Sequence, residues 1–230
     1  MNEPTADLTR YAVISPHLDD GIFSCGQLLA ALPGGMVITA FAGRPGPEQA
    51  LTLWDRAGGF DAGCDVVAAR RAEDRAALDV LAATPVWLDF RDLQYGQSAS
   101  IEALARGIET ALKHHRVQSV LLPLGLHHRD HRRLHSACLS AMQRDRCARD
   151  WFIYEDAIYR RYAGLVTQKL SELEILGVRL ERIELPAGPL ALKRAAVECY
   201  TTQLKALSSF GFPGYADVFE AEVYWRVQAG

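Results

Sequence analysis

The sequence lacks the features that would assign it to a membrane or to a nucleic acid. No apolar run is long enough to span a bilayer, and the polar opening MNEPTADLTR contains no apolar signal region. The formal net charge of -3 comes without any block of like charges, so no surface for nucleic acid or anionic lipid is indicated. We therefore expect a cytoplasmic protein that binds small molecules, without nucleic-acid partners or stable membrane insertion.

Cysteine is also sparse. The five cysteines are odd in number, widely spaced and without a Cys-x-x-Cys motif, which predicts reduced and mostly buried thiols. Cys25 and Cys138 lie beside histidine-containing loops, but Cys25 belongs to an apolar helical pattern in which a small hydrophobic side chain is expected. No internal repeat or linker divides the chain, and 230 residues at 49% hydrophobic composition can bury one substantial core. We expect a single domain over residues 1–230.

Short apolar runs alternate with helical patterns through most of the chain, as in an α/β fold. Strands are predicted over residues 11–14, 36–42, 85–89, 119–124 and 151–156, and helices over 22–32, 66–83, 101–115, 131–144, 165–176 and 190–207. Two later segments, 178–185 and 220–227, are also predicted strands, the second at a sheet edge. The expected fold is Rossmann-like, a mostly parallel sheet flanked by helices with the active site at the carboxyl ends of the strands.

Polar side chains crowd the point where the first predicted strand ends, in the stretch AVISPHLDDG. His17, Asp19 and Asp20 are expected to project from this strand-to-helix turn. Adjacent aspartates repel each other when ionised, and a bound cation in a tight turn makes both anions tolerable. The competing interpretation is that one of the two aspartates merely caps the following helix.

A second strand-to-helix turn of the same character follows later in the chain. The apolar run SVLLPL leads into GLHHRDH, and four of the seven histidines fall between His127 and His135. Two such turns at one edge of a parallel sheet are the expected layout of a metal site built from two loops. His131 and His135 are four residues apart on one helical face, a spacing that can itself hold a metal, so spacing alone leaves the third ligand open.

These two stretches resemble the signatures of one known family. The segment PHLDD, from Pro16 to Asp20, resembles the His-Pro-Asp-Asp signature of the LmbE-like, or PIG-L, family of zinc-dependent N-deacetylases, and HRDH, from His128 to His131, resembles its His-x-Asp-His signature. Three weaker matches support the resemblance. The segment RRAE, which starts at Arg70, resembles the Arg-x-x-Glu helix of the family, and FRD, which starts at Phe90, resembles a loop with an aspartate near the substrate. The segment KRAAVECYTTQ, which starts at Lys193, resembles a late helix that ends in Ser-Gln or Thr-Gln.

The resemblance implies an N-acetylglucosaminyl deacetylase that uses one zinc ion, with another divalent metal as an option. It implies His17, Asp20 and His131 as the metal ligands and leaves His135 as a surface or supporting residue. Two imidazoles and one carboxylate, with an open position for water, are a ligand set that catalytic zinc uses. Zinc lowers the pKa of a bound water from 15.7 to about 7, which makes a nucleophile available at neutral pH.

The remaining site residues follow from the same comparison. Asp19, left free of the metal, is the expected general base, and His128, if protonated, would steady the oxyanion formed at the amide carbonyl. Asp130 would orient a neighbouring imidazole. Arg70 and Asp92 stand where the family has substrate contacts, although the charges along residues 66–83 would otherwise predict an ordinary solvated helix face.

Three other positions carry open interpretations. Leu18 replaces the usual proline of the first signature, and Gly21 replaces the glutamate that commonly follows the two aspartates, which removes a carboxylate from beside the metal ligands. Glu155 and Asp156, at the end of the predicted strand 151–156, either support the site or cap a helix. Trp54 is expected to be structural, with stacking on a sugar or acyl group as the alternative.

The implied substrate is a small amino sugar or related glycoconjugate, whose N-acetyl group is hydrolysed to acetate and a free amine. The spacing of the residues alone implies only metal-assisted hydrolysis. One alternative is a metal-dependent hydrolase of another bond, for instance a phosphoester cleaved with two metals. The other alternative is a non-catalytic carbohydrate-binding relative. Association into a homo-oligomer is left open.

Overall fold

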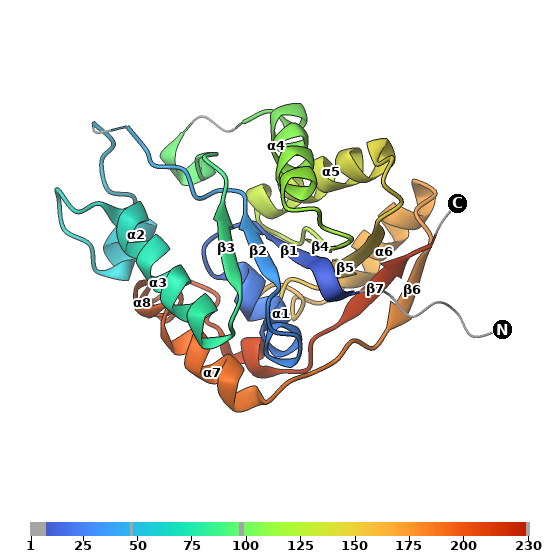
Figure 1. The fold of residues 1–230 in the computed structure, drawn as a ribbon. Helices are drawn as coiled ribbons and strands as arrows, with labels where there is room; N and C mark the ends of the chain where they lie inside the picture. The colour runs from blue at the N-terminus through green and yellow to red at the C-terminus, as the bar shows by residue number, and fades with distance from the viewer. Residues whose placement is uncertain (1–7, 47, 97–98, 229–230) are drawn as a thin grey trace.

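The computed structural model describes residues 8–46, 48–96 and 99–228, and its strands form one seven-stranded sheet (Figure 1). The strand order is β3-β2-β1-β4-β5-β7-β6. Strands β1 to β5 pair in parallel, whereas β7 pairs antiparallel with both β5 and β6. The strand bounds are Tyr11–Ser15, Met36–Thr39, Thr84–Trp87, Ser119–Pro123, Asp150–Tyr154, Leu180–Ile183 and Tyr224–Val227, for β1 to β7 in order. The predicted α/β class with a mostly parallel sheet is confirmed.

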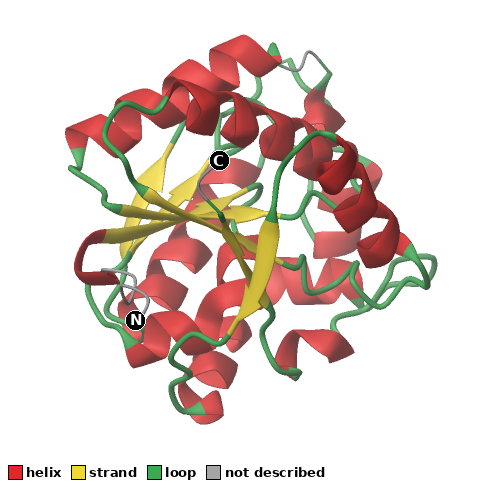
Figure 2. Ribbon diagram, turned by 90° about the vertical axis from the view of Figure 1, so that its right-hand side faces the viewer, coloured by secondary structure: helices red, strands yellow, loops and turns green. Residues whose placement is uncertain are grey.

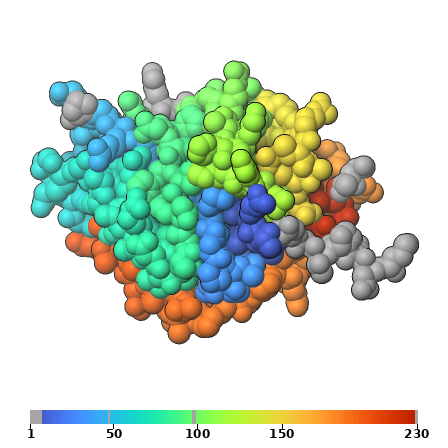
Figure 3. Space-filling model, in the orientation of Figure 1, coloured from blue at the N-terminus to red at the C-terminus, as the bar shows by residue number. Residues whose placement is uncertain are grey.

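Helices cover both faces of the sheet (Figure 2). Helices α4 and α5 pack against each other on one face, and α1 contacts α7 on the other. In the space-filling view the green surface of α4 lies beside the yellow-green and yellow surface of α5 and the residues that follow it (Figure 3). The bounds of α1 to α8 are Asp20–Ala31, Leu53–Gly58, Val66–Val80, Ile101–His114, Arg129–Arg144, Leu165–Ile175, Leu190–Glu198 and Thr201–Leu207, and the 3-10 helices are Leu8–Arg10, Leu93–Tyr95 and Ala216–Phe219.

Strand β1 lies at the centre of the parallel part of the sheet. All five of its residues, YAVIS, are buried, as expected for a short apolar strand covered by helices on both faces. It pairs with β2 on one side and with β4 on the other. Because β1 and β4 are parallel neighbours, their carboxyl ends lie side by side, and the loops that follow them leave the sheet at the same edge.

The structure corrects the sequence prediction for the last third of the chain in one respect of topology. Strand β7, within the predicted strand 220–227, lies between β5 and β6, so the sheet edge is β6 instead. Tyr224 of β7 is buried against Ile183 on one side and Tyr154 on the other. No helix in the described ranges is long and apolar enough to cross a bilayer.

The predicted helix 190–207 is broken at Cys199 and Tyr200 into α7 and α8. The Tyr200 side chain is fully buried, and its hydroxyl donates a hydrogen bond to Asp74 on α3 at 2.7 Å. Glu73 of α3 caps the new helix, because its carboxylate accepts hydrogen bonds from the Thr202 amide at 2.9 Å and from the Thr201 hydroxyl at 2.6 Å. Tertiary contacts with α3 therefore end one helix and start the next.

Candidate metal centre and active site

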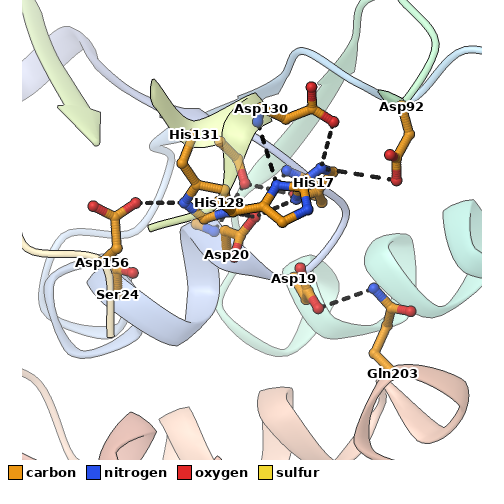
Figure 4. Close-up of polar contacts among 12 residues, drawn as sticks. His17, Asp19, Asp20, Ser24, Asp92, His128, Asp130, His131, Asp156 and Gln203 are labelled. Carbon is orange, nitrogen blue, oxygen red and sulfur yellow. Dashed lines mark hydrogen bonds and ion pairs between the residues drawn. The ribbon is translucent and has the colours of Figure 1, made fainter. Parts of the chain in front are cut away.

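The loops after β1 and β4 bring the two histidine- and aspartate-rich turns together. Helix α1 begins at Asp20 and α5 begins at Arg129, so each polar turn is the short link between a buried strand and its helix. Figure 4 shows the side chains from the two turns converging on one cluster. The predicted site at the carboxyl edge of the sheet therefore forms around residues from both signatures.

Three potential ligand atoms lie close together in this cluster. Asp20 Oδ2 lies 3.0 Å from His17 Nδ1 and 3.1 Å from His131 Nε2. Zinc bonds to nitrogen and oxygen measure about 2.0–2.2 Å, so two tetrahedral ligand atoms stand about 3.3 Å apart. His131 Nε2 is buried and makes no hydrogen bond to any residue that the structure describes. His131 Nε2 thus faces a carboxylate oxygen at 3.1 Å without a well-formed hydrogen bond, as a metal ligand would, so the chemistry of these three residues fits a divalent ion such as zinc.

Two carboxylates hold the histidines from outside the cluster. His131 Nδ1 lies 2.5 Å from Asp156 Oδ1, so the Nδ1 proton is held by Asp156 and the Nε2 lone pair is left for a metal. His17 Nε2 lies 3.4 Å from Asp130 Oδ2, which also accepts a hydrogen bond from the Leu93 amide at 3.0 Å. Asp130 thus contacts an imidazole, as expected, and that imidazole is His17.

Asp156 was one of two acids that the sequence left open. Its Oδ2 accepts hydrogen bonds from the amides of Gly125 and Leu126, at 2.9 and 3.1 Å, in the loop that leads to the second signature. The neighbouring Glu155 accepts a hydrogen bond from Trp225 at 3.1 Å instead. Asp156 therefore fixes both the backbone of the loop and the ring of His131.

Two other combinations, neither of which includes Asp20, bring single ligand atoms of three residues close together. Ring nitrogens of His17, His128 and His131 lie within 4.8 Å of one another, as do single ligand atoms of His17, Asp92 and Asp130. His128 Nδ1, however, accepts a hydrogen bond from the Asp130 amide at 3.3 Å, which caps α5 and occupies that nitrogen. That leaves Nε2 of His128 as a candidate ligand atom. We favour Asp20 because it carries negative charge and contacts both His17 and His131.

Asp19 lies next to the cluster without joining it. It stands at the N-cap position of α1, but its side chain makes no capping hydrogen bond, so the capping interpretation fails for this residue. Its Oδ2 accepts a hydrogen bond from Gln203 Nε2 at 3.0 Å (Figure 4). Burial, followed by the neighbouring Asp20 carboxylate, raises the pKa of Asp19 to about 7. The carboxyl group can therefore both take up and release a proton near neutral pH.

The charges of the cluster favour a cation. Burial opposes ionisation of Asp20, but the imidazoles of His131 and His17 hold its pKa well below the usual range. Burial opposes protonation of His131 as well, yet Asp20 and Asp156 raise its pKa to about 9. Buried carboxylates thus draw positive charge onto the two histidines, and a bound divalent metal would replace those protons.

His128 has the opposite tendency. Burial, followed by the imidazoles of His17 and His131, lowers the pKa of His128 to about 3, so the ring is neutral. Because Nδ1 accepts the Asp130 amide proton, the ring proton of this neutral form is on Nε2. His128 is therefore a neutral hydrogen-bond donor in the cleft. Its surroundings do not favour the protonated ring that the sequence analysis considered.

His135 lies outside the cluster. Its Nδ1 is 2.8 Å from the Pro123 carbonyl oxygen at the end of β4, so the ring donates a hydrogen bond to the backbone. The side chain is almost fully buried, and burial lowers its pKa to about 3. His135 is accordingly a neutral core histidine within helix α5.

A cleft of about 480 Å³ opens beside the cluster. Arg70 and Asp92 both line it. Arg70 is buried, which excludes a solvated helix face for this residue, and it pairs with Asp55 at 3.0 Å. Its Nε and one terminal nitrogen have no hydrogen-bond partner among the described residues. Asp92 Oδ2 lies 3.8 Å from His17 Nε2, on the side of the cluster opposite Asp156 (Figure 4).

Aromatic side chains form part of the cleft wall. Trp54 packs edge-on against Phe212 with ring centroids 4.9 Å apart. Tyr159 lies 5.0 Å from the His131 ring, and Tyr162 stacks on Tyr159 at 6.5 Å. All four aromatic residues line the cleft. The structural interpretation of Trp54 is therefore incomplete, because its ring also faces the space in which a substrate would lie.

Sequence reasoning missed the position of Gln203. The Thr-Gln ending of the late helix is part of the family resemblance, and no spacing rule connects residue 203 to residue 19.

Close packing explains why a glycine stands at position 21. A Cβ at that position would lie 3.0 Å from Val37 Cγ1 and 3.2 Å from Ser15 Oγ, so Val37 and Ser15 fill the place of the glutamate side chain that the family usually has there.

The mostly parallel α/β sheet, with an imidazole and carboxylate cluster built from two loops at its edge, is consistent with an LmbE-like fold. The sequence profile described as PIG-L, GlcNAc-PI de-N-acetylase, matches residues 12–142, more than half of the chain. The chain therefore belongs to the PIG-L family. The matched range includes both signatures and ends before β5, so Asp156 and Gln203 lie outside it. No curated protein matches the chain.

Solved structures of deacetylases have the same fold. The A40926 pseudoaglycone deacetylase Dbv21 is 25% identical, with a TM-score of 0.76 over 96% of this chain and 97% of that one. A zinc-inhibited form of teicoplanin deacetylase Orf2 is 22% identical, with a TM-score of 0.77 over 96% and 98%. The N,N'-diacetylchitobiose deacetylase of Pyrococcus horikoshii is 16% identical, with a TM-score of 0.52 over 86% and 71%. The second and third similarities show the fold alone.

Proposed function

We propose that this protein is a zinc-dependent amidohydrolase that removes an N-acetyl or related N-acyl group from an amino sugar or glycoconjugate. Family membership and the similarity to Dbv21, a pseudoaglycone deacetylase, support deacetylation as the reaction class. The observation that carries the proposal is Asp19, a carboxyl group beside the candidate metal ligands that is hydrogen-bonded to Gln203 and lines the cleft. A site that only binds has no use for a spare base in this position.

His17 Nδ1, Asp20 Oδ2 and His131 Nε2 would hold the zinc ion, and another divalent metal with the same ligand preference could replace it. A zinc ion bound there would supply a Lewis acid for the amide carbonyl and a low pKa for water. Asp156 contacts Nδ1 of His131, which would leave the Nε2 lone pair for the ion, and Asp130 contacts Nε2 of His17, which would leave its Nδ1.

The remaining chemistry belongs to residues of the chain. Asp19 takes the proton from the attacking water, whose oxygen forms the new bond to the amide carbon. The neutral Nε2–H of His128 donates to the oxygen that becomes negative. The carbon–nitrogen bond then breaks while Asp19 returns this proton to the departing nitrogen. The second water proton, on the new carboxyl group, passes to the amine on release, so the products are acetate and an ammonium group. Asp19 ends the cycle in its starting state, so no further acid or base is needed.

The cleft suits a sugar with an attached group. We place Arg70 and Asp92 at the sugar, because both line the cleft close to the candidate ligands and offer a donor and an acceptor for hydroxyl groups. The aromatic residues that line the cleft offer stacking faces for sugar rings or for an aglycone. We also propose that the whole chain is one domain of this kind, and that it acts in the cytoplasm, where its five free cysteines would stay reduced.

The test is the release of acetate and of free amine from a panel of N-acetylated sugars and glycosides, with zinc-loaded protein. Asp19→Asn should keep its zinc and lose at least 100-fold in kcat, because general-base catalysis contributes about 100- to 10,000-fold. Asp79→Asn is the matched control, since Asp79 is an exposed aspartate of α3 that does not line the cleft. Loss of zinc from Asp19→Asn would instead make Asp19 a ligand.

Two results would favour the alternatives. Zinc-loaded protein that releases no amine from the panel but binds its members would indicate a carbohydrate-binding relative. Release of phosphate from phosphoesters, with two metals bound per chain, would indicate hydrolysis of another bond. A second ion has little room of its own, because the candidate group His17, Asp92 and Asp130 shares His17 with the first site.

A further inference from the structure

Gln203 connects the candidate base to the aromatic mouth of the cleft. Its Nε2 donates to Asp19 Oδ2 at 3.0 Å, and its Oε1 accepts a hydrogen bond from Trp54 Nε1 at 3.0 Å. The Gln203 side chain is buried, with 4% of its surface exposed. Three side chains, from the N-cap of α1, from α8 and from α2, thus form one chain of hydrogen bonds.

The indole fixes the direction of this chain. A tryptophan nitrogen can only donate a hydrogen bond, so the Gln203 atom that faces Trp54 must be the oxygen. The amide NH₂ group is then forced to face Asp19. If the amide were turned over, its oxygen would lie against the Asp19 carboxylate and its NH₂ group against the indole N–H, and both hydrogen bonds would be lost.

Asp19 depends on this contact for its orientation. Its carboxylate makes no capping bond to α1, and Gln203 is its hydrogen-bond partner among the described residues. Helix α8, which carries Gln203, is itself held by Glu73 of α3 through the Thr202 amide at 2.9 Å. The position of Gln203 is therefore set by the fold and is independent of Asp19.

We propose that Gln203 is a positioning residue that holds the Asp19 carboxylate toward the cleft, and that Trp54 acts through Gln203 by fixing the orientation of its amide. The catalytic consequence rests on the proposed function, whereas the contact itself does not. Trp54 also packs on Phe212 at the mouth of the cleft. A substrate group in contact with Trp54 and Phe212 would therefore be connected to Asp19 through two hydrogen bonds, from Trp54 to Gln203 and from Gln203 to Asp19.

The first test observes the contact without any substrate. The side-chain amide signals of Gln203 in a ¹H–¹⁵N NMR spectrum are assigned by their loss in Gln203→Glu. We expect Asp19→Asn and Trp54→Phe each to shift these signals, since each removes or changes one partner. Trp225→Phe is the matched control, because it removes an indole hydrogen bond to Glu155 outside the cleft. Gln203 signals that stay unchanged in both Asp19→Asn and Trp54→Phe would overturn the proposal.

The second test measures the consequence in the zinc-loaded enzyme. With an N-acetylglucosaminide that the wild type hydrolyses, Gln203→Glu should lower kcat about 10- to 100-fold, the cost of a misplaced catalytic group. Trp54→Phe, which keeps an aromatic ring, should lower kcat several-fold with less than a twofold change in KM. Zinc content, measured in parallel, should match that of Trp225→Phe. An unchanged kcat in both variants, or a change in KM alone, would overturn the positioning role.

The two tests separate this proposal from the proposed function. If the amide signals respond as expected while no panel member is hydrolysed, the proposed function fails and the positioning of Asp19 stands. If hydrolysis occurs and the signals do not respond, the deacetylase stands and the positioning of Asp19 is refuted.

Discussion

Asp156→Asn is the most informative single substitution outside the candidate ligands. The carboxylate uses Oδ1 for the His131 ring and Oδ2 for the amides of Gly125 and Leu126. Asparagine has only one oxygen, so it must lose one of these two sets of contacts. If its oxygen stays with the backbone amides, its NH₂ group faces His131 Nδ1, which must then accept a hydrogen bond and move the ring proton to Nε2. The candidate ligand atom of His131 would carry a proton and could not bind zinc.

The other orientation costs folding free energy. If the asparagine oxygen stays with the ring of His131, two buried backbone N–H groups lose their acceptor, at about 1–3 kcal/mol each. Loss of a supporting carboxylate typically weakens metal binding 10- to 100-fold, which corresponds to about 1.4–2.7 kcal/mol. We therefore expect a weaker zinc affinity by one to two orders of magnitude, with or without a lower free energy of unfolding, according to the orientation that the amide adopts.

The measurement is a zinc competition titration against a chelator of known affinity, with urea unfolding of the metal-free protein beside it. Glu155→Gln is the matched control, because this adjacent acid bonds to Trp225 and not to the site. It should change zinc affinity less than twofold. A folded Asp156→Asn protein with the zinc affinity of the wild type would refute the argument that Asp156 sets the tautomer of His131.

Three further outcomes are expected. His131→Ala should abolish stoichiometric zinc binding and His135→Ala should not, as measured by metal analysis after dialysis; the opposite result would move the ligand along α5. The pKa of His135 is about 3 in the folded protein, against 6.5 for an ordinary histidine. Below pH 6.5 the unfolded chain therefore binds a proton that the folded protein does not. The free energy of unfolding should fall by up to about 1.4 kcal/mol for each pH unit below 6.5. His135→Gln should remove this part of the slope in urea unfolding at pH 7 and 5, and identical slopes would contradict it. Arg70→Met should cost about 3–5 kcal/mol, because it leaves the fully buried Asp55 without its cation; recovery in Arg70→Met with Asp55→Leu would identify the unpaired charge as the cause.

Much of the site could be found in the sequence because its residues lie in short, continuous stretches. His17 and Asp20 are three positions apart at the end of a buried strand, and the turn between β1 and α1 brings them together whatever the rest of the chain does. The second turn works in the same way for His128 and His131. That the two turns meet was predictable as well, since the carboxyl ends of parallel strands share one edge of a sheet.

Other contacts depend on how distant segments pack. Asp156 and Glu155 look alike in the sequence, and only the path of the chain after β5 directs one carboxylate to His131 and the other to Trp225. The burial of Arg70 likewise depends on Asp55, which follows a loop of irregular structure. A charged helix face and a buried ion pair have the same local pattern, so residue spacing could not separate them.

The sequence by itself determined the α/β class, the alternation of strands and helices, and the identity of the two polar turns, because these follow from local hydrophobic periodicity and from residue types at fixed spacing. The tertiary structure alone decided that β7 lies inside the sheet, that helix 190–207 is broken, and that Gln203 reaches Asp19. These features arise from side chains such as Tyr200 and Glu73, whose partners lie more than a hundred residues away and are chosen by burial and hydrogen bonding in the folded chain.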